Sequence, residues 1–545
     1  MKFKIRKLRK SRNLVLVFLF LIFLALRLFT STPSHFIGGD DAKYLKLADN
    51  FPNHTLDNKS LFLLHGPGFP YAIHFLSYLS EDHIAGIVIS LISSIVAFFV
   101  LYKLIMLVSK NYNLAIMTLV LFTLSVENIK FATLIHKESF MIMLFLLSIY
   151  FFLKGVLKDK RYYYFASFFG IVTALTTDHV LFLLASFVAA YAIFGNLKKI
   201  QKSAAIPIIL TVLFYSLILF TRFSVYSSNV YYSTGVDGVI EKVSDFGVRQ
   251  IFSPAYFPET IELVFSKSSL IVNVLFIFGY MFNIVPFVIP PGLDRSTVNT
   301  LFSDNLTSFF TSIKLIVYLA LFLMFIIGIY YLLKDLKKKK FRNNPHLFFF
   351  LMFLLFIFPI TQRITTIRFV LMATIPLFYF IALGAVKIKI NRNFKINLLL
   401  LAVLILLLTP FYWIASNNHF VLSADKTIEA SNTAAFLDTL PEEGVMSQVG
   451  YSPELNYQTD KRIITMPSDP STLDRILKDF EISYILYGER YWEKFSDDNA
   501  DRVFNYDTIE YVRENPQKFR LIKVIKEDYE VIGATDEISV YEVVS

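Results

Sequence analysis

The chain has 545 residues, of which 55% are hydrophobic, and its mean hydropathy is +0.55. This composition excludes a single water-soluble globule, because soluble domains balance apolar and charged residues more evenly. The absence of cysteine excludes disulfides, thiolate nucleophiles and cysteine-ligated zinc. Residues 421–545 hold 25 acidic and 13 basic side chains, so the net charge of +10 comes from the rest of the chain, where basic tracts lie beside apolar runs. That placement is typical of cytoplasmic loops in membrane proteins and argues against nucleic-acid binding.

The N-terminal segment predicts a membrane helix. A basic stretch over residues 1–12 precedes an apolar run from Asn13 to about Thr30. A run of this length can span a bilayer, and no small-residue cleavage site follows it. We therefore expect an uncleaved first helix with its N-terminus in the cytoplasm.

Eleven further apolar stretches follow. They are residues 84–108, 113–126, 139–157, 162–177, 179–195, 204–221, 268–290, 312–333, 346–360, 366–386 and 395–415. Stretch 268–290 is rich in proline near its end, so we predict a broken or re-entrant segment, since such backbone is tolerated only against protein or a wet cavity. The prediction is a polytopic α-helical membrane domain over residues 1–415 with about 11 crossings, an outside loop at 32–82 and another at 222–267.

After about Trp413 the pattern changes to alternating helix and strand. Helices are predicted at residues 427–440 and 471–480, and strands at 445–449, 462–466, 484–488, 521–527 and 538–544. Residues 416–545 are therefore expected to form a small α/β domain. Counting the crossings places this domain on the exocytoplasmic side of the cell (plasma) membrane.

Two adjacent carboxylates stand in the first outside loop. Asp40 and Asp41 could do acid–base work on an acceptor hydroxyl. The simpler reading is that Asp40 caps a helix and Asp41 complements its dipole, and both roles can hold together. Further along the loop, His65 begins a Gly-Pro turn and could face an anionic group or be an interfacial histidine with no special role.

Other ionisable residues stand beside later apolar stretches. A turn over residues 127–139 carries Lys137 and Glu138, which are either functional or simply solvated. Arg363 and Arg368 could clamp a phosphate or anchor a helix end. A divalent metal held by His136, Glu138 and the loop carboxylates is a further reading, although the spacing matches no recognised ligand pattern.

The order of these motifs resembles the GT-C membrane glycosyltransferases that use polyprenyl-phosphate sugars, such as the protein O-mannosyltransferases and the aminoarabinose transferases. Members of that superfamily carry an acidic pair, with a tyrosine four residues after its first residue. Asp40-Asp41 and Tyr44 are similar to this motif. The superfamily has three further motifs that are similar to later segments of this chain. They are a Pro-rich turn, an acidic residue leading the fourth helix, and an Arg-Tyr pattern before a proline. These segments are His65–Pro70, Lys137-Glu138, and Arg368-Phe369 with Pro376. His65 replaces a lysine, Phe369 replaces a tyrosine, and the Trp-Trp-Asp signature of oligosaccharyltransferases is absent.

The resemblance implies a membrane glycosyltransferase with a polyprenyl- or dolichyl-phosphate sugar as donor and a glycan, lipid or protein as acceptor. It implies catalytic roles for Asp40 and Asp41, and supporting roles for Tyr44 and Glu138. It also implies that the donor phosphate is bound by the basic candidates His65, Lys137, Arg363 and Arg368. No cofactor is assigned, and a divalent cation could be held. The alternatives are a transporter or flippase for a lipid-linked glycan, and a non-catalytic membrane assembly factor.

Overall fold

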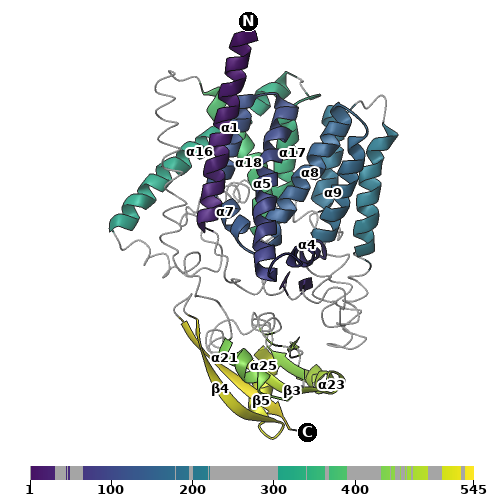
Figure 1. Cartoon of the computed structure of the whole chain (residues 1–545), viewed down its shortest axis with the longest axis vertical. Coiled ribbons are helices and arrows are strands. Elements are labelled where there is room, and N and C mark those ends of the chain that lie inside the picture. Colours follow the sequence, from purple (N-terminus) through teal and green to yellow (C-terminus); the bar gives the residue numbers. More distant parts are fainter. Residues whose placement is uncertain are drawn as a thin grey trace.

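The computed structural model describes a bundle of helices and a small sheet domain, which lies beyond the end of the bundle opposite the N-terminus (Figure 1). The described residues are 2–30, 44, 45, 47, 48, 66–177, 180–195, 201–218, 220, 305–338, 341–361, 367–388, 431–441, 444–447, 455, 459, 461, 463–467, 470–488, 506–529 and 534–544. The predicted outside loop 222–267, the segment 268–290 and the domain boundary at 415 and 416 lie outside them and stay predictions.

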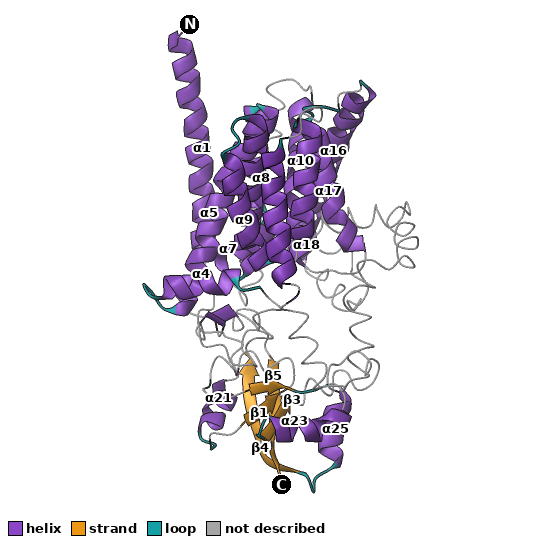
Figure 2. Ribbon diagram, turned by 90° about the vertical axis from the view of Figure 1, so that its right-hand side faces the viewer, coloured by secondary structure: helices purple, strands orange, loops and turns teal. Residues whose placement is uncertain are grey.

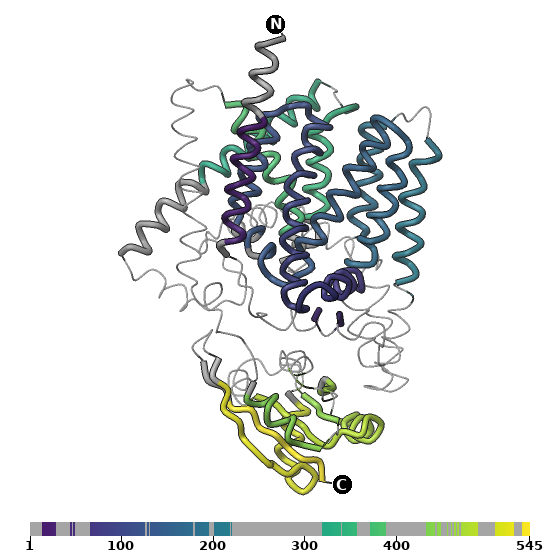
Figure 3. Tube along the Cα trace, in the orientation of Figure 1, coloured from purple at the N-terminus to yellow at the C-terminus, as the bar shows by residue number. Residues whose placement is uncertain are grey.

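The bundle consists of apolar helices that run between its two ends and of the shorter helices α4 and α7 (Figure 3). They are α1 (Lys2–Thr30), α4 (Gly68–Ser77), α5 (Asp82–Ser109), α6 (Tyr112–Leu124), α7 (Val126–Thr133), α8 (Lys137–Leu157), α9 (Tyr162–Thr176), α10 (Val180–Phe194), a helix within Lys202–Ile218 that η1 (Lys202–Ala204) opens, α16 (Asn305–Lys337), α17 (Pro345–Thr361) and α18 (Ile367–Lys387). Within the described residues, α5, α8 and the Leu319–Lys337 part of α16 are long and apolar enough to cross a membrane. The predicted membrane protein is confirmed, and the number of crossings stays a prediction.

Three segments of the bundle differ from the sequence prediction. The stretch 113–126 ends early, because Ser125 is extended and closes α6 at Leu124. The segment that follows was predicted as a turn, but residues 126–133 form the short helix α7. The Ser125 carbonyl accepts the Ile129 N–H, so the backbone resumes helical bonding at once. Similarly, the predicted outside loop 32–82 contains the helix α4.

Glycines bring α16 and α18 into backbone contact. A Cβ added at Gly384 would overlap the carbonyl oxygen of Met324, and one added at Gly328 would overlap that of Phe380. The contact is therefore reciprocal, with one glycine from each helix. Small residues of this kind are typical of membrane helix interfaces, because apolar side chains gain little there over contact with lipid.

The C-terminal part is a mixed five-stranded sheet flanked by helices (Figure 2). Its elements are α21 (Ser431–Asp438), β1 (Gly444–Ser447), β2 (Ile463–Thr465), η3 (Pro470–Thr472), α23 (Leu473–Asp479), β3 (Ile482–Gly488), α25 (Tyr506–Glu514), β4 (Phe519–Tyr529) and β5 (Ala534–Val543). The strand order is β2-β1-β3-β5-β4, in which β1 pairs in parallel with β2 and β3, and β5 pairs antiparallel with β3 and β4. The predicted strands and the predicted helix after β2 are confirmed, whereas α25 was not predicted.

The sheet buries both faces. Val445 packs with the α21 residue Leu437 on one face, and the next residue, Met446, packs with α23 and α25 on the other. Strands covered on both sides read as continuous apolar runs, which is why β1 and β3 lack the alternation of a half-exposed strand. A residue of β4 caps the N-terminus of α21. The buried Glu527 carboxylate accepts hydrogen bonds from the Thr433 N–H at 2.5 Å and from the Thr433 hydroxyl at 2.6 Å.

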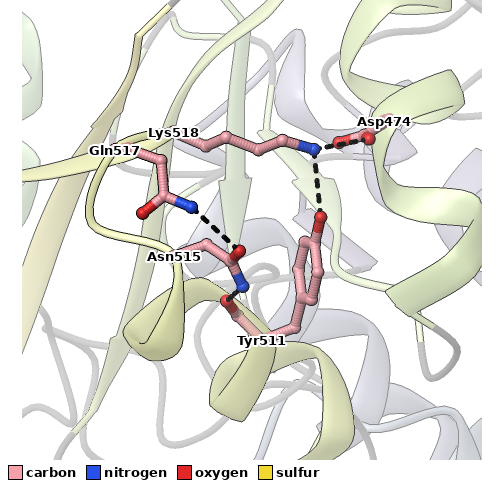
Figure 4. A network of polar contacts seen from close by, with 5 residues as sticks. All are labelled: Asp474, Tyr511, Asn515, Gln517 and Lys518. Carbon is pink, nitrogen blue, oxygen red and sulfur yellow. Dashed lines mark hydrogen bonds and ion pairs between the residues drawn. The ribbon is translucent and has the colours of Figure 1, made fainter.

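A polar network joins α23 and α25 to the start of β4 (Figure 4). The ammonium of Lys518 donates to Asp474 at 2.9 Å and to the hydroxyl of Tyr511 at 3.0 Å. The hydrogen bond to Tyr511, followed by that to Asp474, holds the pKa of Lys518 above its ordinary value. The network is exposed, so it orients the elements of the domain more than it stabilises them.

Replacing Gly384 by alanine should loosen the bundle. The added methyl group must push α16 and α18 apart, and overpacking of this kind costs about 1–3 kcal/mol. Thermal unfolding of the full chain in detergent measures the loss. Leu323→Ala is the matched control, since this α16 side chain is exposed and should change stability little. Equal unfolding temperatures for Gly384→Ala and the wild type would contradict the close contact.

Candidate active site

Three described segments beside predicted outside loops meet at one end of the bundle. A Cβ at Gly86, near the start of α5, would approach the Ile135 side chain, just before α8, to 2.6 Å. The Ser90 hydroxyl donates to the carbonyl of His136 at 3.3 Å. A Cβ at Gly66 would lie 2.7 Å from the Leu175 carbonyl oxygen, at the end of α9. The first loop, the α7–α8 connection and the end of α9 are therefore neighbours, and we call this region the loop end of the bundle.

The Gly-Pro turn has the rigid form predicted for it. Gly66 has a φ of +76°, which favours glycine, and it leads directly into α4. Gly68 packs its backbone against the side chain of Thr176 on α9, where a Cβ would overlap the hydroxyl. The turn is thus held against the bundle. His65, immediately before it, lies outside the described residues, so its contact with a donor stays a prediction.

An apolar cluster fixes the segment after the acidic pair. Tyr44 is fully buried, and its ring meets the Phe69 ring edge-on at 5.2 Å. The Phe69 ring lies 5.8 Å from that of Phe140, in the first turn of α8. The carbonyl of Ala48 is hydrogen-bonded to Nδ1 of His74 on α4 at 2.8 Å. The described residues of 44–48 are helical, so a helix follows the acidic pair closely.

Asp40 and Asp41 themselves lie outside the described residues, and their catalytic role stays a prediction. Tyr44 is four residues after Asp40, and the cluster around it includes Ile135 and is packed by Phe140. The apolar cluster therefore places the end of the acidic motif beside the segment that carries Lys137 and Glu138. The composite site of Asp40, Glu138 and Arg368 itself stays a prediction, because Asp40 and the side chain of Arg368 lie outside the described residues.

Lys137 and Glu138 are buried at the N-terminus of α8. Their exposed fractions are 2% and 1%, so the reading of a solvated interface turn is wrong. Oε2 of Glu138 lies 3.2 Å from Nδ1 of His136. A carboxylate in the first turn is stabilised by the helix dipole, whereas a cation such as Lys137 is disfavoured there. Buried charges in membrane segments are costly and mark functional sites by default.

Arg27 is a buried cation that the sequence interpretation missed. It lies in the last turn of α1, and its Cζ stacks 3.5 Å above the ring of Phe23. Its Nε donates to the hydroxyl of Ser94 on α5 at 3.0 Å, and Nη1 donates to the carbonyl of Thr123 on α6 at 3.4 Å. A lone arginine inside an apolar run was the available signal, since such residues are rare in spanning segments. Arg27 thereby joins the end of α1, which precedes the first loop, to the break between α6 and α7.

The two late arginines belong to the segment that opens α18. Arg368 lies in the first turn of this helix, although its side chain is not described, and Arg363 lies outside the described residues. Tyr379, toward the other end of α18, hydrogen-bonds His346 at the start of α17. That end adjoins the end of α10, because the Asn343 N–H donates to the Ile193 carbonyl. The first turn of α18 therefore lies at the loop end of the bundle.

The described part of the chain does not show whether the candidate site binds a metal ion. Among its residues, no group of three or more His, Asp or Glu side chains could hold an ion. Two of the four candidate ligands, Asp40 and Asp41, lie outside it. A divalent cation therefore stays a prediction that requires a chemical test.

Comparison with known proteins supports the class of enzyme that the motifs indicate. Residues 64–226 match the family described as dolichyl-phosphate-mannose-protein mannosyltransferase. This segment contains the Gly-Pro turn, Lys137 and Glu138. The match confirms the resemblance to the GT-C membrane glycosyltransferases. No curated protein sequence matches the chain significantly.

Three solved structures have a partly similar course of the chain. The Archaeoglobus fulgidus oligosaccharyltransferase in complex with Zn and sulfate is 12% identical, with a TM-score of 0.48, over 96% of this chain and 72% of that chain. The arabinofuranosyltransferase AftD from Mycobacteria is 10% identical, with a TM-score of 0.45, over 98% and 40%. ArnT from Cupriavidus metallidurans, bound to undecaprenyl phosphate, is 9% identical, with a TM-score of 0.40, over 98% of both chains.

Replacing Arg27 by glutamine should destabilise the loop end. The shorter amide cannot reach both the Ser94 hydroxyl and the Thr123 carbonyl, and losing hydrogen bonds from a charged donor costs about 1.5–3 kcal/mol. Arg27→Lys should be destabilised as well, since an ammonium lacks the planar fork of donors. Thermal unfolding in detergent measures both variants. Leu21→Ala, at an exposed position of the same helix, is the control, and Arg27→Gln should unfold at a clearly lower temperature than this control.

Proposed function

We propose that this protein transfers a sugar from a polyprenyl- or dolichyl-phosphate donor to a hydroxyl of a glycan, lipid or protein acceptor at the outer face of the membrane. The single observation that carries the proposal is the burial of Lys137 and Glu138 beside the helix that follows Asp40 and Asp41. Opposite charges gathered there suit a reaction in which a hydroxyl loses a proton while a phosphate leaves. The family match over residues 64–226 supports the same class of reaction.

The proposed chemistry is a single displacement with inversion. The acceptor oxygen attacks the anomeric carbon, and its proton passes to the carboxylate of Asp40. The bond between the anomeric carbon and the phosphate oxygen breaks on the opposite face, so the lipid phosphate leaves with the electron pair. Asp41, Glu138 and Tyr44 support this geometry. A lipid phosphate is already a good leaving group, so it needs charge neutralisation more than a proton.

Basic side chains would supply that neutralisation. Lys137 stands at a helix N-terminus, where the dipole opposes a cation but favours a bound anion. A phosphate at this position would contact both the ammonium and the helix end. His65, Arg363 and Arg368 are the other proposed phosphate ligands, and the two arginines flank the end of α18 that lies at the loop end of the bundle.

The position of the charged groups favours an enzyme over a transporter. Transporters place their substrate sites near the bilayer midplane, often on broken helices. Here Arg27, Lys137 and Glu138 gather at one end of the described helices. A non-catalytic assembly factor would not require buried ionisable groups beside an acidic loop. The α/β domain is proposed to lie on the exocytoplasmic side with this end, as a lid or acceptor platform.

Asp40→Asn should abolish most of the transfer. Loss of general-base catalysis costs about 10²–10⁴ in rate. Membranes that carry the wild type or the variant are supplied with a panel of radiolabelled polyprenyl-phosphate sugars, and labelled product is counted. Asp159→Asn is the matched control, because Asp159 is exposed in the turn at the far end of α8. Equal transfer by the wild type and Asp40→Asn would remove Asp40 as the base.

Removal of divalent metal should leave transfer largely intact. The proposed displacement neutralises the leaving phosphate with protein cations, so no step requires a metal ion. The transfer assay is repeated after treatment with EDTA and again after Mg²⁺, Mn²⁺ or Zn²⁺ is restored. Loss of transfer that a restored cation reverses would instead establish a metal-dependent enzyme.

A further inference from the structure

His136 contacts the candidate site but has no role in the proposed reaction. It immediately precedes α8, and its Nδ1 lies 3.2 Å from Oε2 of Glu138. The exposed fractions of the two side chains are 18% and 2%. An ionised carboxylate can only accept hydrogen bonds, so beside an ionised Glu138 the Nδ1 of His136 is the donor in this contact. A charge-assisted bond of this kind is shorter and stronger than a neutral one.

Contacts with α5 and α7 hold His136 in place. The backbone carbonyl of His136 accepts from the hydroxyl of Ser90 on α5, and its ring lies 5.5 Å from the ring of Phe131 on α7 at an interplanar angle of 70°. Ser90 and Phe131 are both buried. His136 is also the residue before the first turn of α8, yet its side chain makes no capping bond with that helix. The ring of His136 thus packs against α7 and contacts the carboxylate of Glu138, while its backbone is bonded to α5.

We propose that His136 is a positioning residue, whose Nδ1–H fixes the orientation of the Glu138 carboxylate in the candidate site. The inference rests on the proposed function and gives His136 a role other than the metal ligation considered from the sequence. A buried carboxylate held by one oxygen keeps the other oxygen in a constant direction. Misplacement of a reacting group by about 1 Å can cost about a hundredfold in rate, which makes such fixation valuable.

Two substitutions separate the hydrogen bond from the packing of the ring. His136→Asn keeps an N–H group at the same bond distance from the backbone as Nδ1 but removes the ring. His136→Phe keeps a ring beside Phe131 but removes the donor. We expect His136→Asn to retain most of the wild-type kcat in the transfer assay, and His136→Phe to lose about tenfold to a hundredfold. The KM for the lipid donor should change little, because the proposed phosphate contacts are made by other residues.

The reverse order of activities would overturn the proposal. If His136→Phe is active and His136→Asn is not, the histidine acts through packing. If excess Zn²⁺ or Mn²⁺ restores His136→Phe, the histidine is a metal ligand and not a positioning residue. A fall in donor affinity with unchanged kcat would likewise contradict a role through Glu138.

The contact between His136 and Glu138 can be tested without measuring sugar transfer. Thermal unfolding in detergent is compared for the wild type, His136→Phe, Glu138→Met and the double variant. The two single effects should not add, because each removes the same hydrogen bond. Additive effects would refute the pairing whatever the activity. If the wild type transfers none of the sugars, the proposed function fails, while non-additive unfolding still supports the contact between His136 and Glu138.

Discussion

The break between α6 and α7 is the constraint on which the loop end of the bundle depends. A helix inside a membrane cannot stop without satisfying the carbonyls that its last turn leaves open. Ser125 is extended, and the carbonyl of Thr123 accepts from the guanidinium of Arg27. The same guanidinium also bonds Ser94 on α5. One buried side chain therefore lets α6 end, and the chain can turn through α7 toward Lys137 and Glu138.

The buried charges follow from that arrangement. Without the turn, α8 would begin in a water-exposed loop, and its first residues would be solvated. Instead the connection before α8 is pressed against α5, where Gly86 leaves room for Ile135. The aromatic contact from Tyr44 through Phe69 to Phe140 then brings the first loop to the same place. Burial strengthens every electrostatic interaction in such a site, which suits both proton removal and phosphate binding.

Much of the fold could be predicted from the sequence. Apolar runs predicted the helices, since a bilayer permits little else, and alternating helix and strand patterns predicted the α/β fold of the C-terminal part. The errors fall where local pattern and tertiary contacts disagree. The segment over α7 carries charges that are typical of a turn, yet Ser125 starts a new helix there. The helix α25 was missed because only one narrow face of it is apolar, where Ile509 and Val512 meet the sheet.

By itself, the sequence determined the class of the protein, its membrane helices and the motifs from which a glycosyltransferase can be inferred. Only the tertiary structure decided that Lys137 and Glu138 are buried and that Arg27 joins α1 to α5 and α6. The physical reason is distance along the chain. Arg27 and Thr123 are 96 residues apart, and burial of a charge depends on such remote partners, whereas hydropathy and capping depend on neighbours.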